Sequence, residues 1–106
     1  MDEQVTGSFA FGPFRLDVHK RLLIRAGQRV ELTQKAIDTL IVLVESAGRT
    51  VAKDALLQRV WPDQSVEENN LTQCIHLLRK TLGESPGDNR YIATEQGVGY
   101  RMRVPD

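Results

Sequence analysis

Residues 66–84 read VEENNLTQCIHLLRKTLGE, and in this stretch polar and apolar residues separate onto opposite faces of a helix. At about 100° per residue, the apolar residues fall on one narrow line, the core-facing spacing of an amphipathic helix. They are Leu71, Ile75, Leu78 and Leu82. The opposite face carries Asn69, Thr72, Gln73, His76 and Lys80, with Arg79 at its edge. A solvated face would more often hold Glu and Lys, which form helices better than Asn and Thr, so we expect this face to serve a purpose besides solubility.

The flanking residues mark the ends of this helix. Ser65 and Glu68 match the capping-box pattern S-x-x-E, which predicts a helix that begins at Val66. Gly83 is typical of a residue that ends a helix. The expected helix therefore covers residues 66–82.

Two further helices are predicted upstream. Thr33 can cap QKAIDTLIVLVES (34–46), in which apolar residues recur at helical spacing. A short extended link leads to KDALLQRVW (53–61), and Pro62 closes this second helix. Two short helices followed by a third with an amide-rich outer face indicate a helix-turn-helix arrangement.

Extended segments flank the helices on both sides. On the N-terminal side, FRLDV (14–18), RLLIR (21–25) and RVELT (29–33) predict three short antiparallel strands. On the C-terminal side, YIATEQGVGYRMRV (91–104) predicts a β-hairpin, because its glycines separate two extended arms. The expected fold class is therefore α+β, a winged helix-turn-helix in which this hairpin is the wing.

Length and charge limit the possible functions. The 106 residues suit one domain, with residues 1–8 as a flexible N-terminal tail and residues 9–106 as the winged-helix domain. The formal net charge is zero, and residues 15–60 hold nine Lys or Arg against five Asp or Glu. Long-range electrostatic attraction to nucleic acid should therefore be weak, so any binding of nucleic acid must depend on individually positioned contacts. The polar, acidic start and the short apolar runs favour the expectation of a cytoplasmic protein.

The outer face of the third helix has chemistry suited to reading DNA bases. Asn and Gln can each present a donor and an acceptor to the adenine edge in the major groove, and His can donate to guanine. Thr can meet a base edge or a thymine methyl group. A polar, solvated face is the alternative interpretation. Arg79 and Lys80 near the end of the helix suit either phosphate binding or an interaction with the helix dipole.

The sequence gives no support for a catalytic or metal site. Cys74 and His76 are two residues apart on a helix and point about 200° from each other, so they cannot share an ion. Cys74 is expected to be a small buried hydrophobe, and His19 a surface residue. Gly97-Val98-Gly99 leads into a strand rather than a helix, which is typical of a turn. We expect no enzymatic activity, no metal and no cofactor.

Several motifs in the right order resemble the OmpR/PhoB-type winged-helix DNA-binding domain. That family pairs a helix ending in L-R-K-x-L with a hairpin reading T-x-x-G-x-G-Y-[RK], and this chain has LRKTL at 78–82 and TEQGVGYR at 94–101. FGPFRLD, the LT before the first helix and LLQRVW also fit, so the resemblance covers residues 9–104. Within the family, the chain looks most like the N-terminal domains of ToxR/CadC-like one-component bacterial regulators, because no receiver domain precedes it.

The resemblance implies a transcriptional regulator that binds double-stranded DNA. Residues 66–82 would then form the recognition helix in the major groove, with the wing on the adjacent backbone or minor groove. Base contacts are expected from Asn69, Thr72, Gln73 and His76. Backbone contacts are expected from Trp61, Arg79, Lys80, Thr94, Tyr100 and Arg101. The wing tip would be Glu95, Gln96 and Gly97.

The resemblance also implies two protein partners. The loop that matches the family segment facing RNA polymerase in some members consists of Pro62, Asp63, Gln64 and Ser65. Family members commonly bind direct repeats as tandem dimers, so a tandem homodimer on DNA is a further expectation. No small-molecule substrate is expected within this domain.

Two departures from the family pattern stand out. Many relatives carry Lys or Arg at the wing tip, where narrow A·T minor grooves attract cations, whereas this chain has Glu95 and Gln96. At Ala52, relatives usually offer Ser or Thr to cap the second helix. We therefore expect Ala52→Ser to stabilise the fold by about 0.5–2 kcal/mol.

A second hypothesis is a winged-helix module that binds proteins and not DNA. The neutral net charge and the wing tip without a cation favour it. The amide-rich helix face, together with Arg101 and Arg103, disfavours it. The two hypotheses differ in whether random-sequence DNA is retarded in a gel at low salt.

Overall fold

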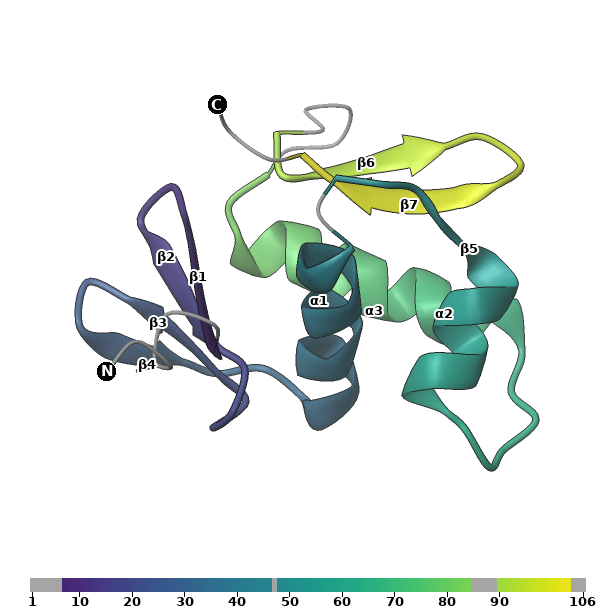
Figure 1. Ribbon diagram of the computed structural model, residues 1–106, viewed down its shortest axis with the longest axis horizontal. Helices are drawn as coiled ribbons and strands as arrows, with labels where there is room; N and C mark the ends of the chain where they lie inside the picture. Colours follow the sequence, from purple (N-terminus) through teal and green to yellow (C-terminus); the bar gives the residue numbers. More distant parts are fainter. Residues whose placement is uncertain (1–6, 47, 85–89, 104–106) are drawn as a thin grey trace.

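Two antiparallel sheets and three helices make up the part of the chain that the structure describes (Figure 1). The computed structural model describes residues 7–46, 48–84 and 90–103, so residues 1–6 of the expected tail lie outside the described residues. The strands are β1 (Ser8–Phe11), β2 (Phe14–Asp17), β3 (Leu22–Arg25), β4 (Gln28–Val30), β5 (Val51–Ala52), β6 (Ile92–Glu95) and β7 (Gly99–Met102). The helices are α1 (Gln34–Glu45), α2 (Lys53–Val60) and α3 (Glu68–Thr81), and none of them has the length and apolar content needed to span a membrane. This is the α+β winged helix-turn-helix that the sequence predicts.

The N-terminal sheet contains four strands in sequence order, each antiparallel to its neighbour. Alternation directs Phe14 and Leu16 into the core and Arg15 to solvent, as the two-residue period of a strand requires. The prediction of three strands was wrong, because β1 forms an additional hairpin with β2 across Gly12 and Pro13. β1 reads SFAF, in which Ser8 is the one polar residue, so it lacks the alternation of apolar and polar residues by which the other strands were predicted.

Helix α1 lies at the centre of the molecule, between the N-terminal sheet and the other helices (Figure 1). Its expected cap is confirmed, since the Thr33 hydroxyl accepts a hydrogen bond from the Ala36 N–H at 3.2 Å. Leu40 is fully buried, and the buried hydroxyl of Thr39 donates to the Lys35 carbonyl oxygen at 2.8 Å. Because α1 contacts both α2 and α3, it supports the helices that carry the candidate site.

The apolar side of α3 packs onto α1 and α2, as the sequence predicts. Its four predicted core residues are at most 3% exposed, namely Leu71, Ile75, Leu78 and Leu82. The predicted start is wrong, because α3 begins at Glu68 with Glu67 at the N-cap, and no side chain caps it. The Glu68 carboxylate instead accepts a hydrogen bond from Lys53 Nζ at 2.8 Å, so it does not complete a capping box with Ser65.

The predicted C-terminal hairpin is confirmed, and a third strand joins it. β6 and β7 are antiparallel, and β5 pairs with the other edge of β7, which gives the order β5-β7-β6. Where β5 and β7 meet, a Cβ at Gly99 would lie 1.9 Å from the Val51 carbonyl oxygen, so the backbones approach too closely for a side chain. This sheet, which we call the wing sheet, lies along one side of the helices (Figure 1).

Candidate nucleic-acid interface

The outer face of α3 is open to solvent. Asn69, Gln73 and His76 are exposed, and Thr72 is half-buried. Within the described part of the chain, no hydrogen bond occupies the side chains of Asn69, Gln73 or His76, whereas the Thr72 hydroxyl donates to the Glu68 carbonyl oxygen at 3.3 Å. Amide and imidazole groups without a protein partner keep their donors and acceptors available to another molecule. The structure thus brings the four predicted base-contact residues together on one face.

Arg79 ties the C-terminal end of α3 to the wing. Its Nη2 atom donates to the Ile92 carbonyl oxygen at 3.0 Å and to Thr94 Oγ1 at 2.7 Å, and its Nε atom lies 3.8 Å from Glu84 Oε1. The side chain of the neighbouring Lys80 is exposed and makes no hydrogen bond or ion pair within the described segments. Lys80 could therefore reach a phosphate without giving up an internal contact, whereas Nε and Nη2 of Arg79 are already engaged within the protein.

Glu84 joins the end of α3 to the start of β6, a role that was not predicted from the sequence. Its side chain is 0% exposed, and Oε2 accepts hydrogen bonds from the N–H groups of Tyr91 at 2.5 Å and Ile92 at 2.8 Å. It follows Gly83, whose φ of 82° lies in the left-handed region, and the N–H groups of both residues donate into the last turn of α3 at 3.1 and 2.8 Å. These bonds form a Schellman motif. An acidic residue directly after the helix-ending glycine was the available signal.

The one basic side chain beside the wing tip is already paired within the described hairpin. Arg101 Nε lies 2.7 Å from Glu95 Oε2, so this pair is satisfied between β6 and β7. The turn is closed by a hydrogen bond from the Val98 N–H to the Glu95 carbonyl oxygen at 2.9 Å, and Gln96 and Gly97 are exposed within it. The Val98 side chain is 54% exposed. The tip therefore presents an amide and an apolar group beside the Glu95–Arg101 pair.

Two of the predicted backbone-contact residues are mostly buried. Trp61 and Tyr100 are each 7% exposed. Lys35 Nζ lies 5.7 Å from the centroid of a Trp61 ring and donates to the Val60 carbonyl oxygen at 2.8 Å, so Trp61 belongs to the junction of α1 and α2. Only a small part of either aromatic side chain is accessible to another molecule.

Two side chains near the helices have shifted pKa values. The hydrogen bond to Glu68, helped by its charge, raises the pKa of Lys53 above 10.5. Burial raises the pKa of the Cys74 thiol above its usual value, which keeps the thiol protonated at neutral pH. Cys74 is 9% exposed, as expected for a small buried hydrophobe.

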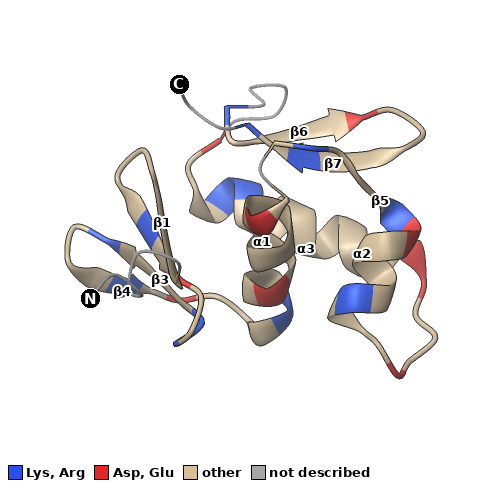
Figure 2. Ribbon diagram, viewed as in Figure 1, with Lys and Arg blue, Asp and Glu red and all other residues tan. Residues whose placement is uncertain are grey.

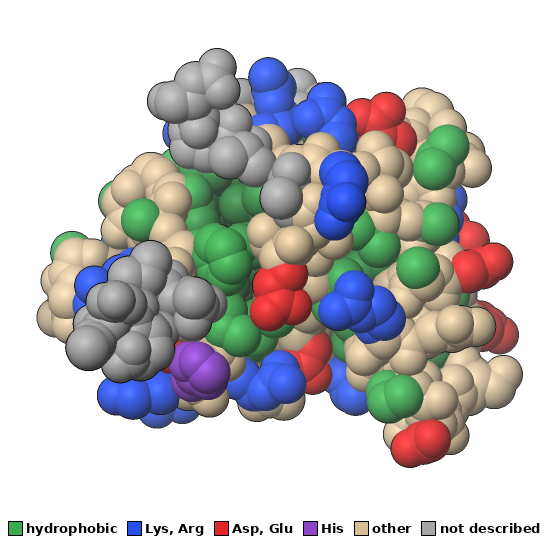
Figure 3. Space-filling view, viewed as in Figure 1, with side chains coloured by type: hydrophobic (Ala, Val, Ile, Leu, Met, Phe, Trp, Pro, Cys, Tyr) green, Lys and Arg blue, Asp and Glu red, His purple; other side chains and the backbone are tan. Residues whose placement is uncertain are grey.

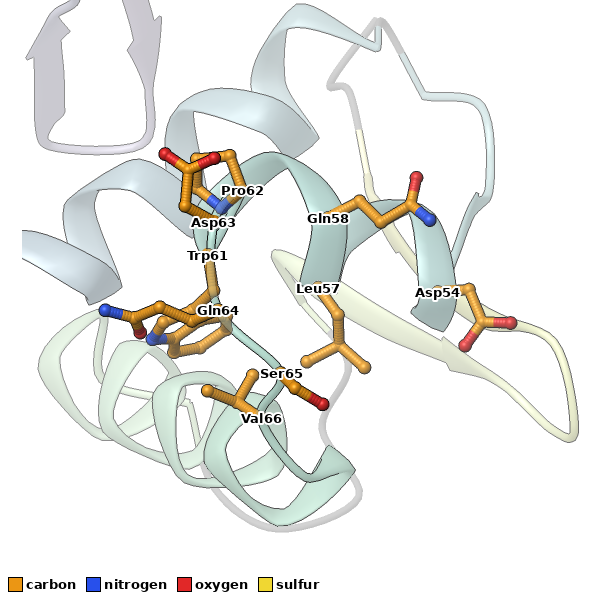
Figure 4. A pocket seen from close by; sticks show the side chains of 9 residues that line it. All are labelled: Asp54, Leu57, Gln58, Trp61, Pro62, Asp63, Gln64, Ser65 and Val66. Atoms are coloured by element: carbon orange, nitrogen blue, oxygen red, sulfur yellow. The ribbon is translucent and has the colours of Figure 1, made fainter.

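A groove of about 590 Å³ lies beside the loop that connects α2 and α3 (Figure 4). All four predicted polymerase-facing residues are exposed and line it: Pro62, Asp63, Gln64 and Ser65. Leu57 and Val66 give the groove apolar lining, and Asp54 adds a second carboxylate to that of Asp63. The loop thus borders a concave, acidic surface that is distinct from the outer face of α3.

Basic and acidic side chains are interspersed over the molecule. Figure 2 shows both signs on the helices and on the wing sheet. On the face drawn in Figure 3, charged side chains of both signs lie beside hydrophobic ones, and the described residues form no continuous basic patch there. This distribution agrees with the zero net charge, which argues against the broad positive field of a nonspecific polyanion binder.

Comparison with known proteins identifies the family. The family model "Transcriptional regulatory protein, C terminal" matches residues 27–102. The chain is 41% identical to the transcriptional regulator HilA of Salmonella typhi over 97 residues, which cover 92% of this chain and 17% of HilA. It is 34% identical to the transcriptional activator CadC of Escherichia coli (strain K12) over 82 residues, which cover 76% of this chain and 16% of CadC. The chain belongs to this family of transcriptional regulatory proteins and spans a small part of the length of these relatives.

Solved structures agree with this assignment. The response regulator DrrB of Thermotoga maritima, an OmpR/PhoB homologue, superposes with a TM-score of 0.83 at 31% identity, covering 92% of this chain and 45% of DrrB. The DNA-binding domain of Klebsiella pneumoniae RstA, crystallised in complex with the RstA box, superposes with a TM-score of 0.76 at 26% identity, covering 90% of this chain and 95% of that domain. The fold is therefore the winged-helix DNA-binding domain of OmpR/PhoB-type transcriptional regulators.

Proposed function

We propose that this domain binds double-stranded DNA at a specific sequence, with α3 in the major groove. The observation that carries the proposal is the exposed face of α3, on which Asn69, Gln73 and His76 have no hydrogen-bond partner among the described residues. A related domain, that of RstA, was crystallised with its DNA box. In this arrangement Asn69, Gln73 and His76 read bases, and Thr72 joins them through its methyl group or its hydroxyl.

The backbone contacts come from the end of α3 and from the wing. Lys80 supplies a free cation, the Thr94 hydroxyl supplies a donor, and the accessible edges of Trp61 and Tyr100 add to them. To contact the DNA backbone, Arg101 would have to give up its ion pair with Glu95 and bind a phosphate instead. Because narrow minor grooves have a strongly negative potential, Glu95 at the tip favours a wing that rests on the backbone.

The proposal is tested by selecting a binding site from random DNA and measuring affinity by fluorescence anisotropy. We expect Gln73→Ala and His76→Ala each to weaken binding to the selected site by about 1–3 kcal/mol and to change binding to scrambled DNA little. Gln28→Ala, in the N-terminal sheet, is the matched control and should bind like the wild type. Equal losses on both DNAs would assign the residue to the backbone instead. Failure to select any site would reject the proposal and favour the protein-binding module.

A contact with RNA polymerase is proposed for the groove beside Pro62–Ser65. The carboxylates of Asp54 and Asp63 would suit a basic surface, and Leu57 would suit an apolar side chain. We expect Asp63→Lys to reduce transcription from a target promoter while affinity for the operator stays unchanged. Full transcription by this variant would reject the groove as the polymerase contact.

A tandem homodimer on DNA is proposed from the family resemblance alone. Analytical ultracentrifugation of the domain on DNA with two half-sites should give two protein molecules per duplex. One molecule per duplex at saturating protein would reject this arrangement.

A further inference from the structure

A buried polar cluster joins the end of α3 to the start of β6. The side chain of Glu84 is 0% exposed and that of Arg79 is 23% exposed. Among the described residues, the buried side-chain nitrogen and oxygen atoms that lack a hydrogen bond are Arg79 Nε and Glu84 Oε1, and these two atoms face each other at 3.8 Å. The two charges therefore compensate one another inside the protein.

Each member of this pair also holds the wing. Glu84 Oε2 accepts the N–H groups of Tyr91 and Ile92, while Arg79 Nη2 donates to the carbonyl oxygen of Ile92. Both backbone polar groups of Ile92, the first residue of β6, are thus bound by side chains at the end of α3. Such charge-assisted hydrogen bonds are stronger than neutral ones, so the wing cannot shift relative to α3 without losing them.

The same cluster orients the hydroxyl of Thr94. Arg79 Nη2 donates to Thr94 Oγ1 at 2.7 Å and thereby uses one of its lone pairs. A hydroxyl has a single proton to donate, and this contact leaves the proton of Thr94 free for an acceptor outside the protein. Thr94 is exposed, so that acceptor can be a phosphate oxygen.

We propose that Arg79 and Glu84 are positioning residues that set the wing, and with it the Thr94 hydroxyl, at a fixed distance from the recognition helix α3. Arg79 Nε and Nη2 are directed at Glu84, Ile92 and Thr94. Drawing these atoms away to a phosphate would leave Glu84 as a buried carboxylate without its counter-charge, which is strongly unfavourable. The inference rests on the proposed function, because it concerns how the wing meets DNA.

The test uses Glu84→Ala and Arg79→Lys, measured by anisotropy on the selected site over a range of salt concentrations. Glu84→Ala removes a negative charge, so electrostatics alone would tighten DNA binding. If Glu84 positions the wing, binding becomes about tenfold weaker instead, through loss of the wing contacts. The slope of log K against log salt stays unchanged, because no cationic contact is lost. Glu45→Ala removes the same charge from an exposed position on α1 and should not weaken binding.

Arg79→Lys keeps the positive charge but loses the planar fork that reaches Ile92 and Thr94 together. We expect it also to bind about tenfold more weakly with an unchanged slope. Wild-type affinity for Arg79→Lys, or tighter binding by Glu84→Ala, would overturn the inference. Should Glu84→Ala fail to fold, the affinity of Arg79→Lys decides alone.

Hydrogen exchange of the DNA-free protein separates this inference from the proposed function. In Glu84→Ala the amides of Tyr91 and Ile92 should exchange faster, while amides of the N-terminal sheet exchange as in the wild type. Unchanged exchange at both amides would overturn the positioning role even if DNA binds. A wild type that binds no DNA would reject the proposed function, whatever the exchange rates are.

Discussion

Two parts of the chain are held together in different ways: the N-terminal part, residues 7–46, and the C-terminal part, residues 48–84 and 90–103. In the first, every strand pairs with its neighbour in sequence, and the following helix has a side-chain cap from Thr33. In the second, β5 pairs with β7, which follows about 47 residues later, and neither α2 nor α3 has a side-chain cap at its start. The half that carries the candidate DNA interface therefore depends on contacts between segments distant in sequence.

These long-range contacts meet at the starts of the two uncapped helices. The Lys53 N–H donates to the Val98 carbonyl oxygen at 3.1 Å, and Lys53 Nζ donates to Glu68 at 2.8 Å. One residue thus connects α2 with the wing and with α3. The N-terminal sheet and α1 are thus specified by local sequence, whereas the geometry of the candidate interface is specified by tertiary contacts.

The largest effect should come from Gly99→Ala. A Cβ at this position would lie 1.9 Å from the Val51 carbonyl oxygen and 2.9 Å from Ala52 Cα, so the backbone of β5 would have to move. We expect a loss of about 3 kcal/mol in the free energy of unfolding, at the upper end of overpacking effects, measured by urea denaturation. DNA affinity should fall as well, because the wing is displaced.

Gly27→Ala is the matched control in the N-terminal part. Gly27 has a φ of 77°, and no described atom lies within 4 Å of the position that a Cβ would take. The cost of alanine therefore comes from the left-handed backbone conformation alone. The expected cost is about 1 kcal/mol, with DNA affinity unchanged. Equal costs at the two glycines would contradict the distinction between a local turn and a close approach of distant strands.

The sequence predicted what depends on local patterns. The apolar line on α3, the Thr33 cap and the terminal hairpin all follow from spacing within one segment, and the structure confirms them. The prediction from sequence was wrong where a residue distant in the chain binds a side chain that a local motif would use. Ser65 and Glu68 fit a capping box, but Lys53 takes the carboxylate of Glu68, and the helix begins two residues later than predicted.

The candidate site shows the same limit. The exposed amides of α3 could be predicted, because helical periodicity alone decides which face points outward. The engagement of Arg79 with Glu84 and Thr94 could not, because it depends on where the chain returns after α3. For the same reason, the sequence alone could not show that Arg101 is paired with Glu95.

The second largest effect is expected for Thr33→Ala, which removes the one side-chain N-cap among the three described helices. The N–H of Ala36 would lose its acceptor at a residue that is 0% exposed, so water cannot easily replace the bond. We expect a loss of about 1–2 kcal/mol in unfolding free energy. Thr33→Ser should retain most of the stability, and an equal loss in both variants would point to packing of the methyl group.

A smaller gain is expected for Ala52→Ser at the start of α2. Ala52 has φ −64° and ψ 149°, the extended geometry of an N-cap, but no side-chain hydrogen bond. Because the first turn of α2 is partly solvated, the new cap should add about 0.5–1 kcal/mol, the lower part of the range expected from sequence. Thermal unfolding of both proteins measures the gain, and an unchanged or lower Tm would contradict the capping assignment.

The smallest effect is expected for Lys53→Met, which removes the charged contact between α2 and α3 but keeps most of the aliphatic side chain. Lys53 is solvent-accessible, so its ion pair with Glu68 should change the Tm only slightly at neutral pH. Since the folded-state pKa is raised above 10.5, the contribution is present below pH 10.5 and is lost as the pH rises through the folded-state pKa. The Tm difference between wild type and variant should therefore be constant near neutral pH and vanish in strongly alkaline solution. A difference that persisted there would show that the effect of the substitution does not come from the charge of Lys53.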